Sequence, residues 1–272
     1  MSSPPFSLLL FSTDAAFVSE ATAAGVDGVV VDWEREGKTQ RQAHADTQIG
    51  ADTVEDLRRV RAATRARVHC RINRYGPGTA REVAQALDEG VDELLLPMVR
   101  SPDEVQRVLD LTAGRCGVGV LVETVDAVRE AAALAQLPLA RAYVGLNDLA
   151  IERGSRTIFA PVEDGTLQLV RRSFKVPFGF GGLTLPEAGA PIPCRLLMAE
   201  MARLSCHYSF LRRSFLRDVR GRDVSVEVPR LLAAIAQLSC RSEEAVEVDR
   251  LALRRAIARA EAEAATAAMP ER

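Results

Sequence analysis

Two carboxylate residues, Glu123 and Asp148, each follow a short apolar run at the point where a buried strand would give way to a helix. The runs are "GVGVLV" (117–122) and "RAYVGL" (141–146). Because parallel strands of a barrel end at one face, side chains that follow neighbouring strands would meet there. Oxygen ligands with open positions suit Mg²⁺ or Mn²⁺. The pair therefore predicts a divalent-metal site.

Other charged residues follow further apolar runs. Asp32 and Glu34 come after "GVVV", Arg71 ends "VHCR", and Arg212 follows "HYSFL". A guanidinium such as that of Arg71 could hold a carboxylate or a developing enolate beside the metal. Asp32 and Glu34 would then brace Arg71 or metal-bound waters. We predict catalytic roles for Arg71, Asp32 and Glu34, and substrate contacts for Arg71 and Arg212.

Each assignment has a simpler alternative. Glu123 and Asp148 could serve as a helix N-cap and a first-turn acid that favours the helix dipole. Arg71 could be a structural ion-pair partner, for example of Glu34. Both alternatives remain open at the level of the sequence.

The segments that must position these residues alternate between apolar runs and amphipathic stretches, a pattern typical of repeated βα units around a parallel sheet. Helical stretches are predicted at 53–64, 79–90 and 101–112, the last with Ser101 as N-cap, Pro102 at the first position and Glu104 completing a capping box. The eight candidate strands are 7–12, 28–33, 67–72, 93–98, 117–122, 141–146, 176–181 and 207–212.

Eight strands with intervening helices match the size of a (β/α)₈ barrel, which is typically about 250 residues. An open doubly wound sheet would need a nucleotide signature near the first strand, but "GFGG" (179–182) comes late and lacks the GxGxxG spacing. We therefore predict an α/β fold: a single (β/α)₈ TIM barrel over 1–222. A C-terminal helical extension over 223–272 would pack on the barrel or on a neighbouring subunit.

The glycine-rich run after the seventh predicted strand has two interpretations. Backbone N–H groups at Gly181 and Gly182 could contact an anionic substrate, since barrels often hold phosphate at this place. A flexible loop is the alternative.

Composition excludes several classes of function. Lys and Arg number 35 against 37 Asp and Glu, so no net basic field indicates nucleic-acid binding. The apolar stretch near the start is too short for a signal peptide or a membrane span, which predicts a cytoplasmic protein without a membrane partner. Five cysteines without CxxC spacing and three scattered histidines argue against a disulfide framework and against a zinc or histidine-based metal site.

Five segments in order resemble the successive motifs of the HpcH/HpaI 2-keto-acid aldolase and citrate lyase β-subunit family, within the pyruvate/phosphoenolpyruvate barrel superfamily. They are "GVDGVVVDWE", "CRINRYG", "VDELLLPMVRSPDEV", "VGVLVETVDAVREA" and "VGLNDLAIERG". The resemblance implies a (β/α)₈ barrel that binds Mg²⁺ or Mn²⁺ and makes or breaks a C–C bond beside a carbonyl. The family's two metal-ligand carboxylates fall on Glu123 and Asp148, and its arginine falls on Arg71.

Two positions bear on the branch of the family. The general-base His of the keto-acid aldolases is replaced by Arg35, and His44 lies nine residues later. Pro97, a candidate substrate contact, is followed by Met98 as in the aldolase branch, and not by the Lys of the citrate lyase branch. Beyond residue 155 the sequence carries no motif of the family.

These features predict a Mg²⁺- or Mn²⁺-dependent carbon–carbon lyase or aldolase acting on a small keto acid or an acyl-CoA thioester. Enolate chemistry coupled to thioester hydrolysis or condensation is a variant of this prediction. The alternative is a diverged barrel that binds a metabolite or serves as a scaffold in a biosynthetic pathway. Arg35 favours this alternative, whereas the intact set of Glu123, Asp148 and Arg71 argues against it. The amphipathic segment 245–266 predicts a homo-oligomer.

Overall fold

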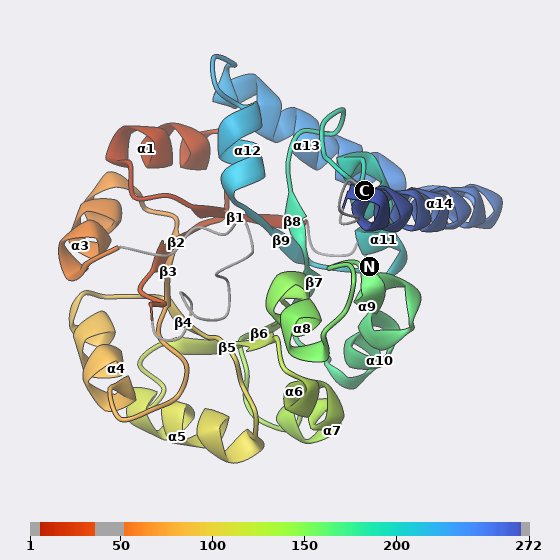
Figure 1. Cartoon of the computed structure of the whole chain (residues 1–272). Coiled ribbons are helices and arrows are strands. Elements are labelled where there is room, and N and C mark those ends of the chain that lie inside the picture. Colours follow the sequence, from red (N-terminus) through yellow and green to blue (C-terminus); the bar gives the residue numbers. More distant parts are fainter. Residues whose placement is uncertain (1–5, 36–51, 268–272) are drawn as a thin grey trace.

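Nine parallel strands form a nearly closed barrel surrounded by helices in the computed structural model, which describes residues 6–35 and 52–267 (Figure 1). The predicted TIM-barrel fold is confirmed. The strands follow the order β7-β6-β5-β4-β3-β2-β1-β9-β8. Their bounds are β1 (Ser7–Phe11), β2 (Gly28–Asp32), β3 (Arg67–Arg71), β4 (Glu93–Leu96), β5 (Gly117–Val122), β6 (Arg141–Val144), β7 (Phe178–Phe180), β8 (Gly182–Leu183) and β9 (Tyr208–Leu211).

The seventh predicted strand, 176–181, corresponds to β7, and the short strand β8 that follows it was not predicted. Gly181 has φ +57°, a left-handed conformation that interrupts an extended strand and suits glycine. Strand β7 before it pairs with β6, whereas β8 after it pairs with β9. The His207 amide donates to the Phe178 carbonyl at 2.8 Å and helps to close the barrel at this break.

The helices lie outside the barrel (Figure 1). In α5 the predicted cap is confirmed, because Ser101 Oγ accepts from the Glu104 amide at 3.4 Å. Glu104 reaches one residue further back than a capping box requires, to the Arg100 amide at 2.8 Å. The helices are α1 (Ala15–Ala23), α3 (Val54–Ala63), α4 (Thr79–Asp88), α5 (Pro102–Thr112), α6 (Val125–Arg129), α7 (Ala131–Leu134), α8 (Leu146–Arg153), α9 (Ala160–Glu163), α10 (Thr166–Ser173), α11 (Cys194–Arg203), α12 (Arg213–Asp218), α13 (Val224–Ser239) and α14 (Glu243–Ala267).

The interior of the barrel is packed, which restricts any chemistry to its ends. Near the N-terminal end Arg141 donates to Glu93 through Nε at 2.5 Å and Nη2 at 2.9 Å. Gly119 makes room for this buried pair, because a Cβ there would lie 2.7 Å from the Arg141 Cγ and from Glu93 Oε1. An apolar layer separates the pair from the opposite end, and it consists of Leu9, Val30, Leu95, Leu121, Tyr143, Tyr208 and Phe210.

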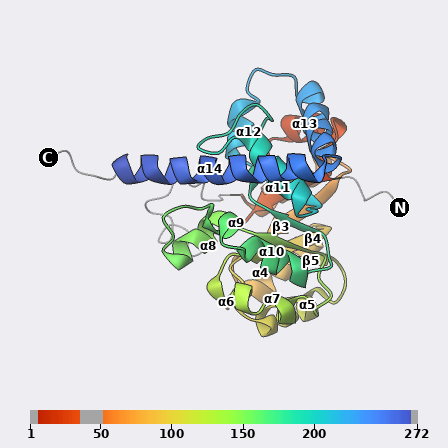
Figure 2. The same cartoon turned by 90° about the vertical axis from the view of Figure 1, so that its right-hand side faces the viewer.

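The last two helices, α13 and α14, differ in how much of their surface packs against the rest of the protein. Helix α13 packs against α1 and α11, and α14 packs against α11. Figure 2 shows α14 running across the barrel and projecting past its edge. Leu253 and Ile257 of α14 are buried, but Val248 is 60% exposed and Leu251 is 50% exposed. None of the helices in the described part of the chain combines the length and apolar composition needed to cross a membrane.

We expect the protein to be a homo-oligomer, because a long helix that leaves Val248 and Leu251 in water gains by burying them against another subunit. Light scattering at micromolar concentration should report a multiple of the 29.5 kDa chain mass. A Leu251→Glu variant should shift the protein toward the monomer, because a charge would then have to be buried in the interface. A monomeric mass for the wild type would contradict the prediction.

Candidate active site at the barrel mouth

Five of the predicted residues lie together at the C-terminal ends of the strands. This end of the barrel is called the mouth below. Asp32 ends β2, Arg71 ends β3, Glu123 follows β5 and Asp148 lies in α8, with Glu34 two residues beyond β2. Their exposed fractions are only 6, 2, 4, 8 and 1%, respectively. Charged side chains are rarely this buried unless they are paired or serve a site. The side chains that the sequence placed at strand ends therefore form one buried polar cluster.

Arg71 is held rigidly by two carboxylates. Its Nε and Nη2 donate to Asp32 at 2.8 and 2.6 Å, and its Nη1 lies 3.1 Å from Glu34 Oε2. Burial alone lowers the pKa of Arg71, but the negative charges of Asp32 and Glu34 outweigh it, so the pKa lies above its usual value. The ion pair with Glu34 that the sequence suggested is present. Since arginine carries five N–H donors, these contacts leave donors for a ligand.

Glu123 is fixed from two sides. Its Oε2 accepts from the Met98 amide at 3.1 Å. Met98 has φ +53°, a left-handed backbone conformation. This conformation raises the free energy of a residue with a side chain, and residues that adopt it are often found at functional sites. On the other side Gly145 provides clearance, because a Cβ there would overlap Glu123 Oε1 and Cγ. Neither the Met98 amide nor Gly145 was singled out in the sequence.

The pKa of Glu123 is raised from 4.5 to about 8. Burial is the main cause, followed by the negative charges of Asp148 and Glu34, while Arg71 and the Met98 amide act in the opposite direction. The Glu123 carboxyl therefore lies in a region of excess negative charge. A bound cation would relieve this repulsion.

Helix capping does not account for the pair of carboxylates. The N-cap of α6 is Thr124, whose Oγ accepts from the Ala127 amide at 2.9 Å, so Glu123 is not the cap. The N-cap of α8 is Gly145, and its amide already donates to the Val122 carbonyl at 3.2 Å. For Asp148, in the first turn of α8, the helix dipole remains as the simpler explanation.

The donor set fits a hard divalent cation. Glu123 and Asp148 supply only oxygen atoms, and the repulsion between them is the kind that Mg²⁺ or Mn²⁺ neutralises. Among residues 6–35 and 52–267, no group of three or more His, Cys, Asp and Glu residues is arranged to hold a metal. Further ligands would thus come from water and substrate, as is usual for Mg²⁺.

A second arginine approaches the mouth from β9. Arg212 is partly buried, and its Cζ lies 4.6 Å from the Phe11 ring centroid, while the Cζ of Arg71 lies 5.2 Å from it. Within the described residues Arg212 has no hydrogen-bond or ion-pair acceptor. Burial and the charge of Arg71 lower its pKa. Such a guanidinium can receive an anionic group of a ligand.

The glycines after β7 serve mainly to join the strands. The Gly181 carbonyl accepts from the Tyr143 hydroxyl and, at 2.9 Å, from Ser209 Oγ. The Gly181 amide donates to the Val144 carbonyl at 3.4 Å, so it is engaged within the sheet. Gly182 begins β8. A substrate contact at Gly181 and Gly182 remains a prediction.

Position 35 does not supply a base. Arg35 is exposed, its amide donates to Asn73 Oδ1 at 2.8 Å, and its Nη2 donates to the Asp52 carbonyl at 2.7 Å. His44 lies outside the described residues. Pro97 is buried directly after β4, and its predicted contact with substrate stays a prediction.

Fold and mouth together define a (β/α)₈ barrel protein with a buried carboxylate pair and two arginines at its C-terminal end. Residues 6–158 match the HpcH/HpaI aldolase/citrate lyase family, which is more than half of the chain. The protein belongs to this family, and the predicted resemblance is confirmed. Comparison with curated proteins finds no significant match.

Solved structures agree on the fold. The HpcH/HpaI aldolase from Desulfitobacterium hafniense DCB-2 superposes with a TM-score of 0.59 at 15% identity, covering 88% of this chain and 95% of that one. Citrate synthase SbnG gives 0.57 at 17% identity, with 86 and 92% coverage. RipC from Yersinia pestis gives 0.56 at 15% identity, with 89 and 98% coverage. At these identities the likeness concerns the barrel alone.

Proposed function

We propose that this protein is a divalent-metal-dependent carbon–carbon lyase or aldolase that acts on a small 2-keto acid or an acyl-CoA thioester. Membership of the family supports lyase chemistry of the aldolase or citrate lyase type. The observation that carries the metal-dependent form is the buried pair Glu123 and Asp148, whose mutual repulsion contributes to the raised pKa of Glu123. A metabolite-binding barrel without chemistry would have no need to bury these charges beside Arg71.

Glu123 and Asp148 would hold Mg²⁺ or Mn²⁺, which when bound supplies Lewis-acid polarisation of the substrate's carbonyl and carboxylate oxygens. The chain contributes the position of the two carboxylates. The Met98 amide orients Glu123, and Gly145 lets it approach α8. Asp148 projects from the first turn of that helix.

Arg71 would bind the substrate carboxylate or the oxygen on which enolate charge develops. Its remaining N–H donors are preorganised by Asp32 and Glu34, so little reorganisation is needed when charge appears. Arg212 would contact a second anionic group of the substrate, because it has no acceptor of its own in the described part of the chain. The Phe11 ring supports both guanidinium groups.

The proton must be moved by a group other than residue 35. A guanidinium has donors but no acceptor, and that of Arg35 donates to the Asp52 carbonyl, so it does not serve as the base. Asp32 is occupied by Arg71 through two hydrogen bonds. We assign the step to a water molecule in the mouth or to a side chain not yet identified.

Arg35 also favours a second candidate, a diverged barrel that binds a keto acid or acyl-CoA without converting it. Exchange of the methyl protons of pyruvate in D₂O separates the two, because exchange requires enolisation whereas binding does not. We expect NMR to show deuterium incorporation that depends on Mg²⁺ and on Asp148. Metal-dependent binding of oxalate without exchange of pyruvate protons would instead support the binding protein.

Metal affinity should depend on pH through Glu123. Its pKa of about 8 in the folded, metal-free protein means that it is mostly protonated at pH 7, and a proton must leave before the carboxylate can bind a cation. Mn²⁺ affinity should therefore rise with pH and level off above pH 8. Calorimetry in two buffers of different ionisation enthalpy should detect about one proton released per ion at pH 7. No proton release would contradict the assignment of Glu123 as a ligand.

The same shift has a consequence for folding. Between the unfolded value of 4.5 and the folded value of about 8, the folded state holds more protons than the unfolded state. The contribution of Glu123 to the stability of the metal-free protein is therefore lost as pH rises through this window. Bound Mn²⁺ should offset that loss, because it binds the folded state.

A further inference from the structure

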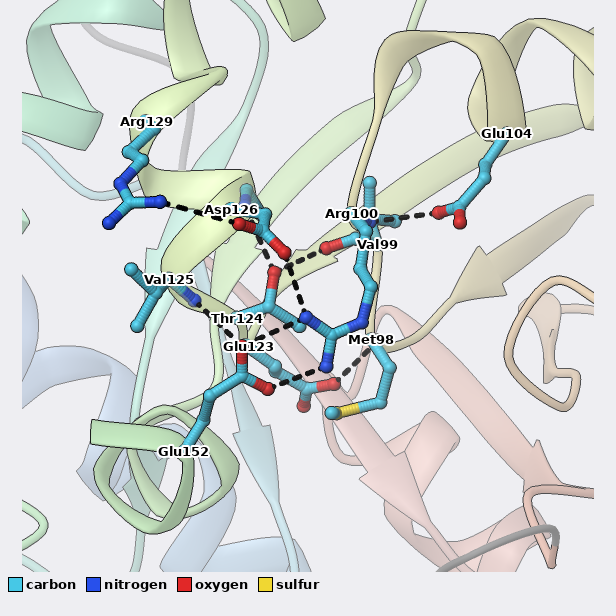
Figure 3. A network of polar contacts seen from close by, with 11 residues as sticks. Met98, Val99, Arg100, Glu104, Glu123, Thr124, Val125, Asp126, Arg129 and Glu152 are labelled. Atoms are coloured by element: carbon cyan, nitrogen blue, oxygen red, sulfur yellow. Dashed lines mark hydrogen bonds and ion pairs between the residues drawn. The ribbon is translucent and has the colours of Figure 1, made fainter. Parts of the chain in front are cut away.

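One side chain outside the mouth joins three of the segments that build it. Figure 3 shows Arg100, which follows β4, between Asp126 of α6 and Glu152 of α8. Its Nη1 donates to Asp126 Oδ2 at 2.8 Å and to Glu152 Oε1 at 3.0 Å, and its Nη2 donates to Glu152 Oε2 at 2.8 Å. Arg100 thus makes a bidentate contact with one acid and a further contact with another.

Each joined segment carries part of the carboxylate pair. The Arg100 segment holds the Met98 amide that binds Glu123. Asp126 lies three residues after Glu123, in the first turn of α6. Glu152 lies four residues after Asp148 on α8, so about one helical turn separates them. A shift of any one segment would therefore move a proposed cation ligand.

Two further hydrogen bonds join the same segments (Figure 3). Thr124 Oγ donates to the Val99 carbonyl at 2.5 Å and links the segments after β4 and β5. Glu152 Oε1 accepts from the Val125 amide at 3.3 Å and links α6 to α8. Among the described side chains drawn in this network, Arg100 contacts both acids, and its partner Glu152 also contacts α6 through the Val125 amide.

Helix α8 depends on such outside contacts. Its N-cap is a glycine without a side-chain hydrogen bond, so local capping does not fix its first turn. Buried Leu146 and Leu149 hold the helix against the barrel. Apolar packing is non-directional, whereas the forked guanidinium of Arg100 sets the orientation of Glu152.

We propose that Arg100 is a positioning residue that holds the segments after β4, β5 and β6 together, so that Glu123 and Asp148 keep the separation that a divalent cation requires. The inference rests on the proposed function, because it assigns a purpose to the spacing of the metal ligands. Sites of this kind need their groups held to within about 0.5 Å.

An ordinary surface ion pair is the competing explanation. The side chains of Arg100, Asp126 and Glu152 are 45, 43 and 21% exposed. Pairs this exposed contribute little to stability, so the fold should survive the loss of Arg100. A surface role predicts no effect on the cation, whereas a positioning role predicts a specific one.

The test compares Arg100→Gln with Arg153→Gln. Arg153 is a matched control, because it lies on the same helix and donates to Asp164 at 2.9 Å and to Thr166 at 3.0 Å, away from the segment of Glu123. Mn²⁺ affinity is measured by electron paramagnetic resonance on the full-length protein above pH 8. We expect Arg100→Gln to bind Mn²⁺ about 10- to 100-fold more weakly than wild type. Arg153→Gln should remain within about twofold of wild type.

Two more variants and a metal-free readout exclude a general loss of structure. Arg100→Lys keeps the charge but not the fork and should recover only part of the affinity. Adding Glu152→Gln to Arg100→Gln should cost little more, since the two residues act as one unit. Without metal, hydrogen exchange of 145–150 should be faster in Arg100→Gln than in wild type, while Tm falls by no more than about 2–4 °C.

The outcomes separate the two proposals. If wild type binds Mn²⁺ and Arg100→Gln binds it equally well, the positioning role is wrong and the proposed metal site stands. Equal weakening in Arg100→Gln and Arg153→Gln would also overturn it, because the effect would belong to the helix in general. If wild type binds no Mn²⁺, the metal site and this inference both fail.

Discussion

Asp148→Asn and Glu123→Gln should each abolish most of the affinity of the protein for Mg²⁺ and Mn²⁺. Each change removes one of only two protein carboxylates from the proposed site, and hard cations are held by the number and charge of their ligands. We expect a loss of more than about 100-fold, beyond what residues outside the ligand shell usually cause. Calorimetric titration of Mn²⁺, with and without oxalate, measures the effect.

Protonation cannot explain the loss in Asp148→Asn. The negative charge of Asp148 is one cause of the raised pKa of Glu123, so its removal moves that pKa back toward 4.5 and leaves Glu123 more fully ionised. Asp110→Asn is a suitable control, since Asp110 is an exposed acid of α5 that accepts from Gln106 Nε2 at 2.8 Å. If Asp148→Asn bound Mn²⁺ as tightly as this control, Asp148 would be a first-turn acid of α8, and the lyase proposal would lose its main support.

Arg71→Ala should leave Mn²⁺ binding largely in place but weaken the retention of oxalate and lower turnover by about 10²- to 10³-fold. In this proposal the guanidinium contacts the oxalate and not the ion. The variant should therefore differ from wild type in the titration with oxalate but not in the titration of Mn²⁺ alone. Arg71 also lowers the pKa of Glu123, and its loss would raise that pKa further. The comparison should therefore be made well above pH 8.

Arg71→Ala also removes the positive charge that pairs with two buried acids, Asp32 and Glu34. Leaving a buried charge without its partner destabilises a protein by about 3–5 kcal/mol. Arg71→Lys avoids most of this cost, because it keeps the positive charge and loses only the planar fork. We expect the Lys variant to fold as wild type and to show the same loss of oxalate retention and turnover. Wild-type turnover in this variant would place the substrate contact elsewhere, with Arg212 as the next candidate.

The proposed homo-oligomer could also affect these measurements. Helix α14 leaves Val248 and Leu251 exposed and projects beyond the barrel, so the partner subunit that covers it would change the surroundings of α11. Figure 2 shows α14 projecting beyond the barrel on the side where α8 lies, and α8 carries Asp148. The Mn²⁺ titrations should therefore be accompanied by light scattering on each variant.

The sequence by itself determined the barrel and the residues at its mouth. Short apolar runs indicated the strands, and apolar residues repeating with the helical period indicated the helices. Because parallel strands end at a common face, Asp32, Arg71 and Glu123 could be placed near one another from their positions alone. Strand β8 was not predicted. It is separated from β7 by the left-handed backbone of Gly181, so that β7 pairs with β6 and β8 pairs with β9.

Only the tertiary structure decided how the mouth is held. The Met98 amide reaches Glu123 because the backbone turns left-handed there, and the Phe11 ring lies under both Arg71 and Arg212. Arg100 and Glu152 are 52 residues apart in the chain, and they meet because the segments after β4 and β6, which flank β5, come to the same side of the barrel. Sequence patterns report which face of an element is buried. They do not report the distance between side chains on different elements, which is set by barrel closure and by the packing of helices on strands.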